Sequence, residues 1–314
     1  MSPVEIFADH TYRMVLLGTA TIGLVSGALG SFAYLRKQSL ISDVISHAAL
    51  PGTLIAFLVC VAIGVDGRSM PALIVGAIVV GTLAVIFANA ITRLSIIRID
   101  AAMAIVLTLF FGVGMLILRT ITNGDYPGKG GISSYLFGNA SVITISDLIT
   151  SLVVGGIALA LTALFWKEFA LRTFDPDHSR VLGFSGRRVD LAMFTTIVIA
   201  TVIGVKAVGL VLMVAFVVTP PAAARQWTRT LPSMVACSAA IGAVGSGIGA
   251  YLSIVLGGWA TGPLIVLTLF VIFVISLLAA PDRSVVTGWR RRRRARRELL
   301  RRLETEAAVA EGLR

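Results

Sequence analysis

Asp43 and His47 are the two residues whose types and spacing are best suited to chemistry. They stand four positions apart, so on a helix both side chains lie on the same face. Carboxylate oxygen and imidazole nitrogen are ligands suited to manganese, iron and zinc, and no thiolate or thioether stands beside them to favour copper(I). The pair therefore predicts part of a binding site for a divalent transition-metal ion.

A purely structural interpretation of the pair is also open. Asp43 would then stabilise the start of its helix, where negative charge is favourable, and His47 would be an interior histidine with its hydrogen bonds satisfied. Two ligands are moreover too few to close a metal site. A second copy of the chain, related by a two-fold axis through a pore, would supply another aspartate and another histidine.

The chain that must position this pair is strongly apolar. It is 57% hydrophobic and 14% charged, with a mean hydropathy of +0.93, whereas a soluble domain carries about 25% charged residues. In lipid each helix satisfies its own backbone hydrogen bonds, so we expect an all-α polytopic membrane protein. Cys60 and Cys237 lie in apolar runs, which favours small buried side chains over a disulfide or a metal ligand.

Stretches of about 20 mostly apolar residues mark the membrane-spanning helices. One further stretch, 191–224, is long enough for two short crossings with a break at Lys206. The single crossings are expected at residues 14–35, 44–65, 71–92, 101–118, 148–166, 231–256 and 262–280.

Basic residues set the orientation, because cytoplasmic loops carry an excess of Lys and Arg. If the polar segment 167–188 is cytoplasmic, the arginine-rich run 290–302 is also cytoplasmic only when 191–224 crosses twice. We therefore expect about nine transmembrane helices, with the N-terminus outside and the C-terminus inside. The domains follow as a transmembrane domain over 1–282, which includes 167–188, and a basic cytoplasmic tail over 283–314.

The net charge of +11 does not indicate nucleic-acid binding. Much of the positive charge lies in 290–302, just beyond the last apolar stretch, where it anchors a chain to the cytoplasmic leaflet. Membrane lipids are therefore the expected partner of this run. Within the spans, the pairs Gly23 with Gly27 and Gly245 with Gly249 predict close helix–helix contacts.

Three ordered blocks of the sequence resemble the permeases of metal-type ABC importers, the zinc/manganese/iron (ABC-3) family. The blocks are 35–52, which contains Asp43 and His47, then 174–183, and then 206–224. In that family the Asp and His of the first block line the translocation path, and the second block is a cytoplasmic coupling segment. The resemblance thus implies that Asp43 and His47 contact the metal. It implies ATPase coupling through Phe174, Asp175, Ser179, Leu182 and Gly183.

The same resemblance implies a permease subunit of an ATP-binding cassette importer for divalent transition-metal ions, in a bacterial cytoplasmic membrane. The loop 123–139 resembles the manganese/iron branch, so manganese is expected first, with zinc or iron also open. Expected partners are a second permease copy or paralogue, a cytoplasmic ABC ATPase dimer and an extracytoplasmic metal-binding protein. The chain has no G-x-x-x-x-G-K-[ST] motif, so we expect no enzyme activity of its own and no permanent cofactor.

Two other functions stay open. A permease for an organic chelate, such as a siderophore or cobalamin, would share the helix count but would not need Asp43 and His47 in its pore. An ATP-independent secondary carrier would work without the segment 175–183. Its transport would be driven by an ion gradient rather than by ATP.

The segment 174–183 is itself predicted to be a short helix that docks into the ATPase. Asp175 is a favoured N-cap, Pro176 is tolerated at the first helical position, and Gly183 can end the helix. Ser179 and Leu182 are three apart and would share the docking face. For the first block, a plain helix pattern places Asp43 near the cytoplasmic end of its span.

Overall fold

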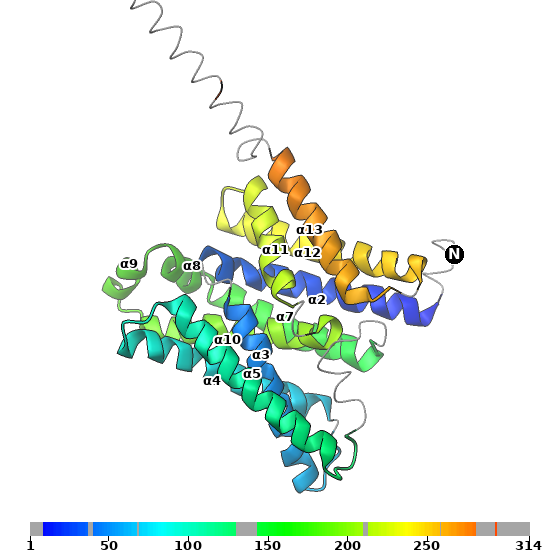
Figure 1. Cartoon of the computed structure of the whole chain (residues 1–314). Coiled ribbons are helices and arrows are strands. Elements are labelled where there is room, and N and C mark those ends of the chain that lie inside the picture. Colours follow the sequence, from blue (N-terminus) through cyan, green and yellow to red (C-terminus); the bar gives the residue numbers. More distant parts are fainter. Residues whose placement is uncertain are drawn as a thin grey trace, which may run out of the picture.

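The chain folds as a bundle of helices (Figure 1). A computed structural model describes residues 9–36, 40–67, 69–129, 143–209, 213–257, 259–280 and Arg293, and every regular element in these ranges is helical. The predicted all-α architecture is therefore confirmed. The helices are α2 (His10–Leu35), α3 (Ile41–Ala62), α4 (Met70–Leu94), α5 (Ile99–Asn123), α7 (Ile145–Leu164), α8 (Trp166–Phe174), α9 (Pro176–Val181), α10 (Gly186–Val208), α11 (Met213–Trp227), α12 (Leu231–Leu256) and α13 (Thr261–Ala279).

Among the described residues, eight helices are long and apolar enough to cross a membrane: α2, α3, α4, α5, α7, α10, α12 and α13. Many large apolar side chains on them are exposed at the surface of the single chain, such as Leu116 on α5 and Phe270 on α13. In water such a surface would be unfavourable, but lipid solvates it. The eight helices thus form the membrane-embedded part of the protein.

Small residues hold α2 against α12. A Cβ atom at Gly23 would collide with the Gly242 carbonyl, and the Ser238 hydroxyl donates a 2.6 Å hydrogen bond to the Gly27 carbonyl. Gly23 of α2 meets Gly242 of α12, and the later residue Gly27 meets the earlier residue Ser238. The two helices are therefore antiparallel. The second predicted pair, Gly245 and Gly249, faces α13. Its predicted close contacts are confirmed as well.

We expect Gly242→Leu to destabilise the bundle, because the added side chain has no space between two backbones. Overpacking of a tight contact typically costs about 1–3 kcal/mol, and here the neighbour is rigid backbone. The melting temperature of the purified protein in detergent should therefore fall. Gly247→Leu on the same helix is the matched control, since a Cβ there meets no atom within 4 Å. Equal melting temperatures for the two variants would contradict this packing argument.

The chain passes through the bundle once more between α10 and α12. The start of α10 lies at the end of α2, where Asp190 contacts Arg36, and Gly204 near its other end lies beside Ile22. Thus α10 ends on the side where α2 begins, whereas α12 begins on the side where α2 ends. The helix that returns is α11, which at 15 residues is about 22 Å long. With α11 included, the described helices make nine passages, so the start of α2 and the end of α13 lie on opposite sides.

The predicted break inside 191–224 exists, but its expected position was wrong. Helix α10 continues through Lys206 and ends at Val208, followed by Gly209 with φ of 88°. Gly209 can adopt this left-handed conformation without the steric cost that a side chain would impose. The helix therefore ends just before Gly209, because of the backbone conformation of this glycine, and not at Lys206.

Several expectations concern residues outside those described. The basic tail 283–314 lies there apart from Arg293, as do residues 130–142 of the loop that resembles the manganese/iron branch. The segment 167–188 is described throughout, and it forms α8, α9 and the start of α10. It lies at the end of the bundle opposite the start of α2 (Figure 1).

Candidate functional site

Asp43 and His47 contact each other on successive turns of α3, as their spacing predicts. The distance from His47 Nε2 to Asp43 Oδ1 is 3.3 Å, and the side chains are 15% and 28% exposed for His47 and Asp43 respectively. The His47 ring also meets the Phe111 ring edge-on, with 4.8 Å between centroids. Two atoms bound to one ion at about 2.1 Å each, with an angle near the tetrahedral value, are about 3.4 Å apart. The pair is therefore already spaced to share a metal ion.

The pair lies deep in the bundle, which corrects the expectation of a site at the cytoplasmic end. His47 contacts Phe111, which is near the middle of α5. Two residues before His47 on α3, Ile45 lies beside Gly81, which also contacts Val198, and Gly81 and Val198 are near the middle of α4 and α10 respectively. Because α3 begins deeper than its neighbours begin or end, its first turns reach the centre of the bundle.

The structure supports one part of the structural interpretation of the pair and not the other. Asp43 lies in the first turn of α3, where negative charge is favourable, although Leu40 occupies the N-cap, and the contact found for Asp43 among the described residues is the one with His47. The Nδ1 atom of His47 is buried and has no hydrogen-bond partner among the described residues. An interior histidine kept only for packing would have both nitrogens satisfied.

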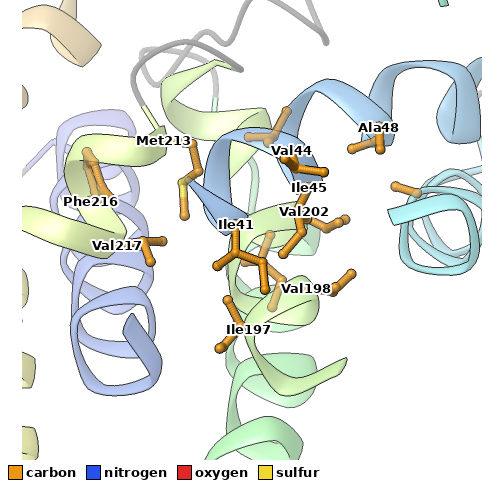
Figure 2. Close-up of a cluster of buried hydrophobic side chains, with 14 of the residues drawn as sticks. Ile41, Val44, Ile45, Ala48, Ile197, Val198, Val202, Met213, Phe216 and Val217 are labelled. Carbon is orange, nitrogen blue, oxygen red and sulfur yellow. The ribbon is translucent and has the colours of Figure 1, made fainter. Parts of the chain in front are cut away.

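The other face of α3 is packed tightly, and this packing fixes the direction of the pair. Figure 2 shows Ile41, Val44 and Ile45 of α3 against side chains of α10 and α11, and the three α3 residues are at most 1% exposed. Further along α3, Pro51 lies inside the helix. Since proline has no N–H group, the His47 carbonyl oxygen lacks its usual helical donor.

The predicted coupling helix is present as α9. The Asp175 side chain accepts a 2.9 Å hydrogen bond from the His178 backbone N–H, and Pro176 is the first helical residue. Helix α9 ends at Val181, and Gly183 follows with φ of 83°. The N-cap, first-position proline and glycine stop are therefore confirmed, whereas Phe174 belongs to the preceding helix α8.

The three-residue spacing had predicted that Ser179 and Leu182 share one exposed face of the helix. They do not. Ser179 is 1% exposed, whereas Leu182 is 55% exposed. The helix ends at Val181, so the spacing rule for helices no longer applies at Leu182. Exposed apolar side chains lie here among exposed charged ones such as Asp177 and Arg180, and we call the apolar set the α9 patch. It consists of Phe174, Val181, Leu182 and Phe184.

Helix α8 connects this segment to the bundle, and the sequence pattern had not indicated it. Trp166 and Phe169 meet Phe32 near the end of α2 edge-on, with 5.8 Å between ring centroids in each case. Phe169 is 1% exposed. The segment that was predicted to couple to an ATPase is therefore connected to the core through α8 and is not a free loop.

A cluster of three charged residues was also missed. Asp190 near the start of α10 pairs with Arg36 at the end of α2 and with Arg172 in α8, at 2.6 and 2.8 Å. The hydrogen bond to Asp190 raises the pKa of Arg172 above its ordinary value, so this guanidinium stays charged at every relevant pH. Arg36 and Asp190 are 154 positions apart, which no sequence spacing reveals. The available signal was an acidic residue directly before a long apolar stretch.

The fold and the site together define a polytopic α-helical membrane protein of the transport type. It has a polar pair at the centre of the bundle and a structured segment at one end. The sequence pattern of the ABC 3 transport family matches residues 8–280, so the chain belongs to this family. It is a multi-pass protein of the bacterial cytoplasmic membrane.

Named relatives carry the same pattern over nearly the whole chain. The zinc transport system membrane protein TroC of Treponema pallidum (strain Nichols) is 39% identical over 92% of this chain and 96% of its own length. The manganese transport system membrane protein MntC of Bacillus subtilis (strain 168) is 39% identical over 91% of this chain and 66% of its own. Among solved structures, PsaBC from Streptococcus pneumoniae in complex with Fab matches with a TM-score of 0.78 and 30% identity. That match covers 90% of this chain and 98% of the other.

Proposed function

We propose that this chain is the membrane-spanning permease subunit of an ATP-driven importer for divalent transition-metal ions. The observation that carries the proposal is the Asp43–His47 pair, spaced at 3.3 Å and placed at the centre of the bundle. Polar groups at this depth are costly in a membrane and are kept for function. The transport systems named for the relatives agree with a metal substrate.

The permease works as a dimer in this proposal. No group of three or more His, Cys, Asp or Glu side chains that could hold an ion occurs in the part of the chain that the structure describes. One chain therefore offers two side-chain ligands, and a second copy or a paralogue would double them. Asp43 is 28% exposed in the single chain, which leaves one side of the pair open to such a partner.

The end of the bundle that carries α8 and α9 faces the cytoplasm in this proposal, with the N-terminus outside. Five basic residues lie between positions 167 and 188, as the positive-inside rule requires of a cytoplasmic segment. A cytoplasmic ABC ATPase dimer docks on α9 and supplies the energy, since the chain has no phosphate-binding motif. An extracytoplasmic metal-binding protein delivers the ion to the opposite end.

Manganese is the substrate that we propose first, and zinc is the main competitor. Carboxylate, carbonyl and imidazole groups suit manganese, but imidazole also suits zinc, and affinity at most such sites favours zinc over manganese. The names of the relatives are also mixed: one of eight is named for zinc, six for manganese and one for chelated iron. The choice therefore has to be made by direct measurement.

The test is transport by the complex purified with its own ATPase and metal-binding protein and reconstituted in liposomes. We expect uptake of Mn²⁺ that requires ATP hydrolysis, measured as metal inside the vesicles. Parallel vesicles receive Zn²⁺, Fe²⁺ or a ferric chelate, and a further set contains the permease alone with an ion gradient. Uptake of the chelate but of no free ion would favour the chelate permease. Uptake by the permease alone, without ATP, would favour the secondary carrier.

A further inference from the structure

The cluster of Arg36, Asp190 and Arg172 ties three elements together at the end of the bundle where α8 and α9 lie. Arg172 donates from Nε to Asp190 Oδ1 at 3.0 Å and from Nη2 to Oδ2 at 2.8 Å, which makes the contact bidentate. Arg36 donates from Nη1 to Oδ1 at 2.6 Å. One carboxylate thus joins α2, α8 and the start of α10.

The same cluster reaches α9 directly. Arg172 Nη1 also donates to the carbonyl oxygen of Pro176, the first residue of α9, at 3.4 Å. The guanidinium is held in place from the other side by Gly186, where a Cβ atom would lie only 2.9 Å from its central carbon. Arg36 is fixed in turn by the ring of Phe194, 5.3 Å below its guanidinium. A hydrogen bond thus links α9 to Arg172, and through Arg172 to Asp190.

From Asp190 a continuous packed path leads to the proposed metal site. Asp190 belongs to α10, and two turns further along this helix Ile197 and Val198 are buried. Figure 2 shows them against Ile41 and Ile45 of α3, the helix that carries Asp43 and His47. Packed side chains of this kind transmit displacement because protein interiors hold few voids.

We propose that Asp190 is the positioning residue through which the ATPase-docking segment moves the site helix. This inference rests on the proposed function, since it assumes an ATPase that pushes on α9. Asp190 touches neither metal nor nucleotide. Its role is to make α8–α9, the end of α2 and α10 move as one body, so that a displacement of α9 becomes a displacement of α3. Without the negative charge of Asp190, Arg36 and Arg172 repel each other. The segment α8–α9, the end of α2 and α10 then no longer move together.

The experiment uses the complete complex in liposomes and compares Asp190→Asn with the wild type. Three quantities are measured: ATPase bound per permease, ATP turnover without the loaded metal-binding protein, and turnover with it. We expect bound ATPase and basal turnover to change less than twofold, whereas the stimulation ratio falls to near one and uptake falls at least tenfold. Asp190→Glu, which keeps the charge, should restore most of the stimulation. The matched control is Asp100→Asn, which removes an exposed carboxylate from the start of α5.

A merely structural role predicts a different result. Loss of folded protein lowers basal and stimulated turnover together and leaves their ratio unchanged, and that outcome would overturn the proposal. If Asp190→Asn does not accumulate, Arg172→Lys takes its place, since lysine keeps the charge but loses the bidentate contact. A normal ratio in that variant would equally overturn it. If the wild-type complex itself shows no ATP-dependent metal uptake, the proposed function fails, and the two failures are thereby distinguished.

Discussion

Replacing His47 by alanine or Asp43 by asparagine is expected to abolish ATP-driven metal uptake while the permease still inserts and assembles. His47→Ala removes one ligand of the pair and Asp43→Asn removes the negative charge of the other, and the 3.3 Å spacing lets both atoms share one ion. Loss of a group that only supports a ligand typically costs about 10–100-fold in metal affinity or activity, so loss of a ligand should cost at least about 100-fold. The measurement is initial uptake of Mn²⁺ or Zn²⁺ by the reconstituted complex.

The matched controls change the same two residue types, a histidine and an aspartate, at positions outside the site. His10→Ala changes an exposed histidine at the start of α2, and Asp100→Asn changes an exposed aspartate in the first turn of α5. Both should transport at nearly the wild-type rate. Wild-type uptake by either site variant would refute a role for the pair in transport. Failure of both site variants to accumulate in the membrane would instead favour the structural interpretation of Asp43 and His47.

A charge placed in the α9 patch is expected to release the ATPase from the permease. Val181 and Leu182 are 82% and 55% exposed, and exposed apolar side chains of this kind gain free energy only when a partner covers them. Truncating or charging such an anchor typically costs about 2 kcal/mol or more, which is about 30-fold in Kd. We therefore expect Val181→Glu and Leu182→Glu to lose the ATPase during purification and to lose metal-stimulated ATP turnover.

The control for this patch is Ile63→Glu, which changes an exposed apolar residue directly after α3, at the other end of the bundle. This variant should retain its ATPase. Ser179→Arg is unsuitable for testing docking, because Ser179 is buried and its replacement would disturb α9 itself. Full retention of the ATPase by both glutamate variants, with normal uptake, would show that the patch is not the contact.

Sequence alone predicts this fold well, because a helix that crosses a lipid bilayer needs a long stretch of apolar residues, which is visible in the sequence. The double passage through 191–224 followed from charge distribution, even though the break was assigned to Lys206 in place of Gly209. The pairing of Asp43 with His47 followed from helix periodicity, which is a local property. The depth of the pair did not, since it depends on where α3 begins relative to α4, α5 and α10.

The charged cluster was beyond prediction, and the α9 patch was predicted only in part, through Phe174 and Leu182, for a related reason. Asp190 and Arg36 are brought together by tertiary packing across the bundle, and Arg172 was counted as one of several basic residues of a cytoplasmic segment. Ser179 was placed on the docking face because helix spacing was extended past the point where α9 ends. In each case the pattern gives the residue type correctly, but the direction of the side chain is set by neighbours that are distant in the sequence.

A divalent cation held at His47 would lie about halfway through the electric field of the membrane, because the His47 ring contacts Phe111 at the midpoint of α5. Moving one elementary charge through the full field is worth about 2.3 kcal/mol per 100 mV. Two charges through half the field gain the same amount, which is about a 50-fold increase in occupancy from outside at 100 mV. With an inside-negative potential, the resting voltage of the cell would thus favour loading of the site before any ATP is hydrolysed. The same voltage would retain the ion against escape outward while the bundle changes its access.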